Sequence, residues 1–359
     1  MKRIIICADG TWNERDQVDK KTKKRHPTNV VKVARAIRSR DKNGVDQIVY
    51  YHDGVGTSGG LDKWTGGVLG EGIEDNVRSL YRSVLYNYES GDELFLFGFS
   101  RGAFTVRTLL GFMNLVGMVQ KDDDYYIPEI YGCYQHGQGP GTPEWIKAFH
   151  NVKDTGPCPP IKFIGVWDTV GSLGPPGILG QVVNRNKYQY HDVGLNLHIE
   201  NAYHALAIDE RRKPFAPSIW KRANGFTGKL EQAWFPGVHS NVGGSCTPDG
   251  LANEALHWMV EKAEGLGLEF DGVFLAHYTP CFNSTLQDSM SAMYKVMGEH
   301  IRPIGVEAPE SEMVHQSALD RLNLALLKYQ PKNLVTYRAN PGVGKTTNTS
   351  RVARGTPCP

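Results

Sequence analysis

The feature of this chain that most restricts its fold is a short apolar run that enters a glycine-flanked turn around Ser100. Residues 94–98 have the composition of a buried strand, the turn has the sequence Gly98-Phe-Ser-Arg-Gly102, and residues 105–113 fit a helix. In a G-x-S-x-G turn between a strand and a helix, glycines allow a tight bend that lifts the serine hydroxyl clear of the sheet. The segment therefore predicts a nucleophilic serine, Ser100, at the end of a buried strand.

Strand-like and helix-like segments alternate through the first two thirds of the chain. Residues 28–38 and 74–88 have helical spacing, and Thr28 or Asn29 is a suitable N-cap. Between these helices lie apolar runs typical of buried strands, at residues 4–7, 48–52, 94–98 and 161–167. The alternation predicts an α/β fold: an α/β-hydrolase-like, mostly parallel sheet with helices on both faces and inserted lid-like loops. From about residue 250 onward, the pattern predicts helices and loops.

A serine hydroxyl is a weak nucleophile at neutral pH, so Ser100 needs a histidine base and an acid that orients this base. In α/β-hydrolases the acid and then the histidine follow the serine along the chain. Asp168 fits the acid because it ends the apolar run 161–167. His239 fits the base because it lies in a glycine-rich loop after the apolar residues 233–238.

Asp209 is the alternative acid, since it also follows an apolar segment. A purely structural interpretation of Asp209, as a carboxylate paired with Arg211 or Arg212, is at least as good. Among the other histidines, His204 and His257 fit the base less well because both fall in helix-like runs.

An ester hydrolase also needs two N–H groups that stabilise the oxyanion of the tetrahedral intermediate. The residue after the nucleophile, Arg101, is expected to supply one backbone N–H. The loop after the first strand is expected to supply the other, from Gly10 or Thr11. Asp9 in the same loop has the alternative role of fixing the loop by hydrogen bonds to its backbone.

Two segments rich in glycine and proline follow predicted strands or helices, at residues 119–160 and 171–180. Both could form an apolar lid that receives acyl chains, or they could be ordinary packed loops. The candidate lid residues are Tyr125, Tyr126, Ile127, Tyr131 and Tyr134 in the first segment, and Leu173, Ile178 and Leu179 in the second.

The length and composition of the chain limit which domain organisation and which classes of protein are plausible. With 359 residues, we expect one catalytic domain over residues 1–337, with insertions near 119–160 and 171–200, and a polar tail over 338–359. The net charge of +2 gives no argument for nucleic-acid binding, and the six scattered cysteines suggest neither a disulfide framework nor a metal site. The chain shows no signal-peptide or transmembrane pattern, so we expect a cytoplasmic protein as synthesised, with export by another route left open.

Two glycine-rich segments imitate nucleotide-binding motifs. Residues 54–59 match G-x-G-x-x-G, but more loop follows where a dinucleotide site would require a helix. Residues 339–346 resemble a phosphate-binding loop, but a polar tail follows in place of a helix. We therefore expect no nucleotide, organic or metal cofactor.

Several segments in one order resemble the catalytic-domain family of type VI secretion phospholipase effectors, over roughly residues 2–337. They include Asp-Gly-Thr-Trp-Asn13, the Ser100 turn and His239-Ser-Asn-Val-Gly-Gly244. The full set spans residues 7–13, 50–57, 98–103, 166–170, 204–211, 235–244, 302–305 and 329–334. The resemblance implies a Ser–Asp–His esterase, with these roles at Ser100, Asp168 and His239. Asn241 stands where many members of the family have an acid.

The combined expectation is a serine hydrolase that cleaves acyl esters, with phospholipids as the expected substrates. Two alternatives stay open: a carboxylesterase for a small soluble ester, and a non-catalytic protein that binds a lipid or metabolite on a hydrolase scaffold. Expected partners are a lipid or ester substrate, a transient membrane-surface contact and, for an effector, an immunity or secretion partner.

Overall fold

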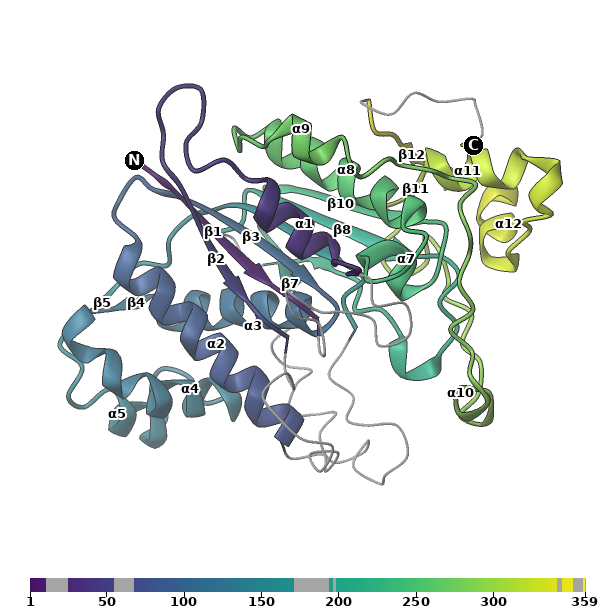
Figure 1. Ribbon diagram of the computed structural model, residues 1–359. Helices are drawn as coiled ribbons and strands as arrows, with labels where there is room; N and C mark the ends of the chain where they lie inside the picture. The colour runs from purple at the N-terminus through teal and green to yellow at the C-terminus, as the bar shows by residue number, and fades with distance from the viewer. Residues whose placement is uncertain are drawn as a thin grey trace.

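The computed structural model describes residues 1–10, 25–54, 68–170, 194–195, 198–340, 344–350 and 358. They form an α/β fold around an eight-stranded sheet with the strand order β12-β11-β10-β8-β6-β3-β1-β2 (Figure 1). Every neighbouring pair in this sheet is parallel. The strands are β1 Arg3–Ala8, β2 Gln47–His52, β3 Glu93–Phe99, β6 Ile161–Trp167, β8 Asn201–Ala207, β10 Lys229–Phe235, β11 Glu312–His315 and β12 Thr346–Thr347. The predicted α/β-hydrolase-like sheet is therefore confirmed.

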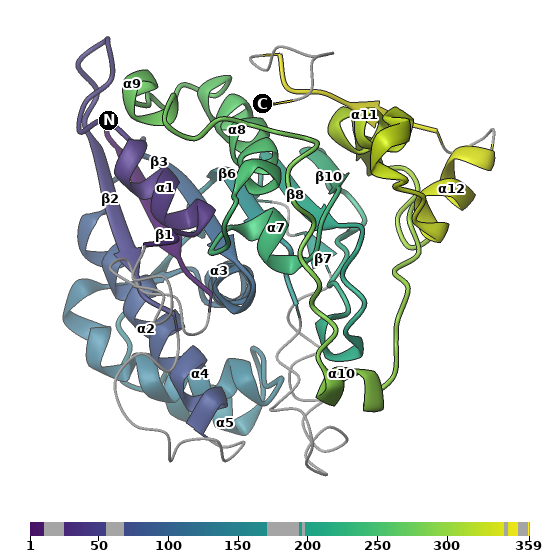
Figure 2. The ribbon, with the colours of Figure 1, turned by 45° about the vertical axis from the view of Figure 1, so that its right-hand side comes forward.

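Helices cover both faces of the sheet (Figure 2). Along β1, Ile4 and Ile6 pack in a core with residues of α2 and α3, whereas Ile5 and Cys7 pack in a second core with α1 and α8. Alternate residues of a strand point to opposite faces, so the sheet buries apolar side chains on both. The helices of the two layers are α1 Asn29–Ala36, α7 His239–Gly243, α8 Gly250–Glu264 and α9 Gly272–Leu275, and, across the sheet, α2 Val68–Asn87, α3 Arg101–Val116, α4 Ile127–Gln135 and α5 Pro143–Ala148.

The sequence correctly predicted the start of helix α1 but assigned the wrong secondary structure to the segment that forms β8. Thr28 is the N-cap of α1, and its side chain accepts a hydrogen bond from the Val31 N–H, as predicted. His204 lies in strand β8 and not in a helix, so that prediction was wrong. The alanines around His204 favour a helix in isolation, but between β6 and β10 they allow a closely packed, fully buried strand.

The insertion at residues 119–160 is folded and does not form an open lid. It contains β4 Met118–Val119 paired with β5 Thr155–Gly156 at its base, the short helix η1 Lys121–Tyr126, and helices α4 and α5. Ile127, Tyr131 and Tyr134 are buried, and both tyrosine rings pack edge-on to Phe112 of α3. For these three residues the lid hypothesis was wrong, because their side chains serve as core. Tyr126 is half-buried against the same core, whereas Tyr125 is 63% exposed.

Two described segments late in the sequence contact the rest of the fold. Thr346–Thr347 form β12, which pairs with β11, and Cys358 is joined to Cys281 by a disulfide. Among the described residues of the predicted tail, Thr346–Thr347 and Cys358 are thus tied to the rest of the fold, and the expectation of no disulfide was wrong for this pair. Strands of four and two residues are too short for a periodic signal, and cysteines 77 residues apart show no local spacing. α11 Gln316–Asn323 and α12 Lys332–Ala339 pack in a third core beside β10 and β11.

The remaining short elements are β7 Gly194–Leu195, β9 Lys221–Arg222, η3 Lys213–Phe215, α10 Ala292–Val296 and η4 Ala325–Leu327. Within the part of the chain that the structure describes, no helix has the length and apolar character needed to cross a membrane.

Candidate active site

The turn between β3 and α3 packs closely against backbone atoms at two positions, Gly98 and Gly102, where a side chain would not fit. A Cβ added to Gly98 would lie 2.6 Å from the Ala103 Cα, and one added to Gly102 would lie 2.2 Å from the Ala8 carbonyl oxygen. Ser100 between them has φ 57° and ψ −122°, an uncommon backbone conformation for a residue other than glycine. Strain of this kind persists where the surrounding structure enforces it, and it is common at functional sites. The predicted serine turn is present.

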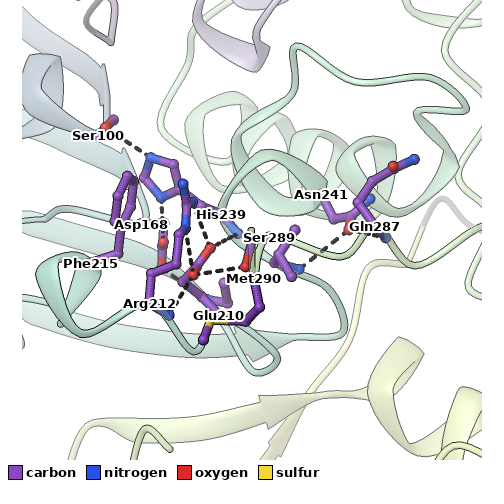
Figure 3. A network of polar contacts seen from close by, with 12 residues as sticks. Ser100, Asp168, Glu210, Arg212, Phe215, His239, Asn241, Gln287, Ser289 and Met290 are labelled. Carbon is purple, nitrogen blue, oxygen red and sulfur yellow. Dashed lines mark hydrogen bonds and ion pairs between the residues drawn. The ribbon is translucent and has the colours of Figure 1, made fainter. Parts of the chain in front are cut away.

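Ser100, His239 and Asp168 lie in one hydrogen-bonded series (Figure 3). His239 Nε2 is 2.8 Å from Ser100 Oγ, and His239 Nδ1 is 2.6 Å from Asp168 Oδ2. Asp168 directly follows β6, and His239 begins the short helix α7 after β10, so parallel strands bring all three to one edge of the sheet. With a proton on Nδ1 donated to Asp168, Nε2 is free to accept the serine proton.

The carboxylate of Asp168 is bound by a buried arginine that the sequence reasoning did not single out as functional. Arg302 donates from Nη1 to Asp168 Oδ1 at 2.6 Å and from Nη2 to Oδ2 at 3.1 Å, and the Ala207 N–H donates to Oδ1 at 3.0 Å. Burial opposes ionisation of Asp168, but the charge of Arg302 and the contact with His239 outweigh it and hold the pKa of Asp168 well below its ordinary value. Asp168 is therefore a carboxylate at neutral pH. Arg302 occurs in one of the resembling segments, but nothing in its local sequence predicted this contact.

A second acidic residue, Glu210, holds the backbone of His239. Glu210 Oε2 accepts the His239 N–H at 3.2 Å, and Glu210 Oε1 accepts the Ser289 hydroxyl at 3.0 Å (Figure 3). Arg212 donates to both carboxylate oxygens of Glu210, from Nε at 2.9 Å and from Nη2 at 2.8 Å. Burial works against the charge on Glu210, but Arg212 lowers the pKa of Glu210 to about 2. The loop that carries His239 is thus fixed by an ion pair.

Two aromatic rings fix the imidazole of His239 itself. The Phe99 ring centroid lies 4.7 Å from that of His239, and the Phe215 ring meets the imidazole edge-on at 5.1 Å. Arg212 covers Phe215, with its guanidinium carbon 3.4 Å from the ring centroid. These contacts limit rotation of the imidazole and hold it between Ser100 and Asp168.

The structure places Asp209 away from His239. Asp209 Oδ2 accepts the Gly237 N–H at 2.6 Å and the Tyr329 hydroxyl at 2.8 Å. The alternative of Asp209 as the acid beside His239 is therefore wrong, and so is its pairing with an adjacent arginine. Arg212 pairs with Glu210, as described above, and Arg211 pairs with Glu299 at 2.8 Å.

Asn241 also makes no hydrogen bond to the Ser–His–Asp series. Its Oδ1 accepts the Gln287 N–H at 3.0 Å and the Val238 N–H at 3.3 Å. Asn241 thus ties the His239 loop to the neighbouring segment. His204 accepts the Thr169 N–H at its Nε2, and burial lowers the pKa of His204 to about 3, so it is neutral and structural.

The three backbone N–H groups predicted as oxyanion donors differ in whether the structure describes them and in whether they already have an acceptor. Arg101 is the first residue of α3, where backbone N–H groups have no acceptor within the helix. The Gly10 N–H already donates to Asp9 Oδ1 at 2.7 Å, so Asp9 occupies that donor. Thr11 lies outside the described residues, as do Leu173, Ile178 and Leu179 of the predicted lid.

Among the described residues, no three His, Cys, Asp or Glu side chains are grouped so that they could hold a metal ion.

A parallel sheet with a strained serine turn, and with histidine and aspartate at the ends of later strands, defines an α/β-hydrolase scaffold. The family model for the catalytic domain of Tle1-like phospholipase effectors of type VI secretion matches residues 2–262. The chain belongs to this family, and the resemblance found in the sequence is confirmed.

The individual proteins that match this chain have low sequence identity to it. An uncharacterized protein of Saccharomyces cerevisiae, YEL023C, is 26% identical over 242 residues, which are 60% of this chain and 32% of that protein. A crystal structure of an uncharacterized protein from Pseudomonas aeruginosa has 18% identity and a TM-score of 0.48, over 78% of this chain and 49% of that one. The Tle1 effector bound to the VgrG spike of the type 6 secretion system has 18% identity and a TM-score of 0.37, over 67% and 50% of the two chains. This chain thus spans a third to a half of these relatives.

Proposed function

We propose that this protein is a serine esterase that hydrolyses acyl ester bonds of phospholipids. The observation that carries the proposal is the hydrogen-bonded series from Ser100 through His239 to Asp168 at the carboxyl edge of the sheet. Membership of a phospholipase effector family supports the lipid substrate. Ser100 is the nucleophile, His239 the general base and acid, Asp168 the residue that orients His239, and the Arg101 N–H one oxyanion donor.

The reaction proceeds in two halves. Ser100 Oγ attacks the acyl carbonyl carbon while its proton passes to His239 Nε2, and the Arg101 N–H stabilises the oxyanion. The bond to the alcohol oxygen then breaks, and His239 gives its proton to this oxygen. In the second half His239 takes a proton from water, which attacks the acyl ester on Ser100. The carboxylic acid leaves and Ser100 recovers its proton.

The decisive experiment incubates a membrane lipid extract with the protein and measures fatty acids and lysolipids by mass spectrometry. The Ser100→Ala variant is expected to abolish product formation without loss of folding, because a small hydroxyl contributes little to packing. Ser83→Ala, on α2, is the matched control and is expected to retain activity. A fluorophosphonate probe is expected to label Ser100 alone. Labelling of another serine, or activity in Ser100→Ala, would refute the assignment.

Hydrolysis of liposomes and of a small soluble ester distinguishes a phospholipase from the two alternatives, a carboxylesterase and a binding protein. A phospholipase hydrolyses liposomes, whereas a carboxylesterase for small esters hydrolyses p-nitrophenyl butyrate but leaves liposomes intact. A binding protein hydrolyses neither. Sedimentation with liposomes tests the transient lipid-surface contact that a phospholipase requires, and co-purification from the native host tests for a secretion or immunity partner.

A further inference from the structure

The side chain of Asp9 is buried directly after β1, beside the Ser100 turn, and the mechanism proposed above does not use it. β1 pairs with β3 as far as Ala8 and Gly98, so Asp9 follows β1 at the level where the serine turn follows β3. A Cβ added to Gly102, in the first turn of α3, would lie 2.4 Å from the Asp9 carbonyl oxygen. The Asp9 backbone is therefore packed against the segment that carries Ser100.

Three hydrogen-bond donors surround the Asp9 carboxyl group. The Thr28 hydroxyl donates to Oδ2 at 2.6 Å, and the Tyr51 hydroxyl donates to the same oxygen at 2.7 Å. The Gly10 N–H donates to Oδ1 at 2.7 Å. Because both oxygens accept hydrogen bonds, the arrangement suits an ionised carboxylate. An amide has one acceptor oxygen, so its NH2 group would face either the Gly10 N–H or the two hydroxyls.

Thr28 links Asp9 to helix α7, which begins at His239. Thr28 is the N-cap of α1, and its backbone pairs with Gly244, the residue that ends α7. A Cβ added to Gly244 would lie 2.8 Å from the Thr28 Cα, so the two backbones are in direct contact. The Thr28 hydroxyl thus binds Asp9, while the Thr28 backbone supports the helix that carries the proposed base.

Helix α7 is held at both of its ends. On the α1 side, Asn29 donates from Nδ2 to the Val242 carbonyl oxygen at 2.9 Å, in addition to the backbone pairing of the preceding residue. At the other end, Glu210 accepts the His239 N–H. The contacts on the α1 side connect α7 to the part of β1 that packs against the Ser100 turn.

We propose that Asp9 is a positioning residue, which through Thr28 holds helix α7 in place and so sets the distance between His239 and Ser100. This inference rests on the proposed function and concerns a residue that acts through others. Proton transfer from Ser100 requires a short contact between its Oγ and His239 Nε2. A displacement of about 1 Å can lower a rate about 10²-fold.

The first test replaces the carboxylate by its amide. Asp9→Asn is expected to lower kcat for ester hydrolysis about 10- to 100-fold and to change KM less than about threefold, because it displaces the base and not the substrate. The matched control is Asp41→Asn. Asp41 is buried and binds Arg3 at the opposite end of β1 at 2.7 Å, so its loss is expected to lower stability but not kcat. Equal losses of kcat in the two variants would overturn the inference.

The link through Thr28 is tested at its hydroxyl. Thr28→Val keeps the shape of the side chain but loses the hydrogen bond to Asp9, so kcat is expected to fall, whereas Thr28→Ser keeps the hydroxyl and is expected to retain activity. Thr28→Val also loses the cap of α1. The double variant Asp9→Asn with Thr28→Val separates the two causes, because changes that act through one link are not additive. Additive losses would overturn the inference.

The pH dependence of kcat is a readout that a loss of stability alone would not move. Burial outweighs the three hydrogen bonds and raises the pKa of Asp9 to about 6. Asp53 after β2 also raises it. Burial also raises the pKa values of the neighbouring Cys7 and Tyr51, so both stay protonated at neutral pH.

The quantity to measure is the ratio of kcat in the unmodified protein to kcat in Asp9→Asn. This ratio is expected to fall toward one as the pH falls through about 6, since a protonated Asp9 no longer presents two acceptor oxygens. Titration of the general base occurs in both proteins and does not by itself change the ratio. A ratio that is independent of pH would overturn the role of the carboxylate.

A measurement without turnover separates this inference from the proposed function. The downfield ¹H NMR resonance of the His239 Nδ1–H, which donates to Asp168, is assigned by its loss in Asp168→Asn. Asp9→Asn is expected to shift or broaden this resonance, and Asp41→Asn to leave it unchanged. An unchanged resonance in Asp9→Asn would overturn the inference. If the unmodified protein hydrolyses no ester, the proposed function fails, while the NMR result still decides whether Asp9 positions His239.

Discussion

Two neighbouring strands, β6 and β8, each lead to an aspartate at the same edge of the sheet, but the two aspartates have opposite surroundings. Asp168, directly after β6, is bound by the guanidinium of Arg302 and by His239. Asp209, two residues after β8, is bound by the Gly237 N–H and by the Tyr329 hydroxyl, which are neutral groups.

The difference appears in the ionisation of the two carboxyl groups. Burial disfavours the charge at both positions, and at Asp209 it prevails and raises the pKa. At Asp168 the charge of Arg302 and the contact with His239 reverse the direction and lower the pKa. At Asp168 the direct contact with the Arg302 guanidinium therefore keeps the carboxylate ionised beside His239, whereas the weaker charge effects of Arg321 and Arg211 at Asp209 do not outweigh burial.

The strongest test of this comparison is the same substitution at both positions. Asp168→Asn is expected to lower kcat for ester hydrolysis about 10⁴-fold, because the amide favours the wrong tautomer of His239. Asp209→Asn is expected to lower kcat less than about tenfold, since Asp209 does not touch His239. Circular dichroism confirms that both variants are folded. A larger loss of kcat in Asp209→Asn would show that the two roles are reversed.

Removal of the compensating charge is the next largest expected effect. Arg302→Met leaves the Asp168 carboxylate buried without its guanidinium, which is expected to lower the free energy of unfolding by about 3–5 kcal/mol at neutral pH. Displacement of Asp168 is expected to lower kcat by up to about 10²-fold. Urea denaturation and ester kinetics measure the two effects.

The double variant Asp168→Asn with Arg302→Met is the matched control, because it removes both charges. Its loss of stability is expected to be clearly smaller than the sum of the two single losses. Additive losses would mean that the ion pair is not the reason for the destabilisation.

The sequence was most informative where structure depends on neighbouring residues. Strands β1, β2, β3 and β6 are apolar runs that end in glycine, aspartate or a turn, and they were located to within one or two residues. The Ser100 turn is likewise a local pattern, and its glycines face backbone atoms at close range. Strand order along the chain then limited the acid and base to few candidates, including the three residues that the structure joins by hydrogen bonds.

What the sequence could not supply are contacts between distant segments. Arg302 lies 134 residues from Asp168, and Ser289 lies 79 residues from Glu210. No spacing or periodicity encodes such pairs. The same limit explains why the role of the insertion at residues 119–160 could not be predicted. From the sequence, Tyr131 fits either a lid or the core, and only its contact with Phe112 places it in the core.

A smaller effect is expected on stability at Asp209. The Asp209→Asn change keeps one oxygen but weakens the two hydrogen bonds to Gly237 and Tyr329, so the free energy of unfolding should fall by about 1–2 kcal/mol. Tyr329→Phe removes one of these bonds alone and is expected to cost less. Urea denaturation at pH 7 measures both. A loss above that of Arg302→Met would mean that Asp209, and not Asp168, is the more important buried acid for the fold.

The finest test is the pH dependence of these stability differences. The pKa of Asp168 is lower in the folded protein than its unfolded value of about 3.9, so its contribution is full above that pH and declines as the pH falls below it. The pKa of Asp209 is raised on folding, so its contribution is full below about pH 3.9 and declines as the pH rises through the folded pKa. From pH 4 to pH 7, the stability of the unmodified protein relative to Asp209→Asn should therefore fall, whereas its stability relative to Asp168→Asn should stay level or rise slightly. Urea midpoints across this range measure both slopes, and slopes of the same sign would contradict the electrostatic difference between the two strand ends.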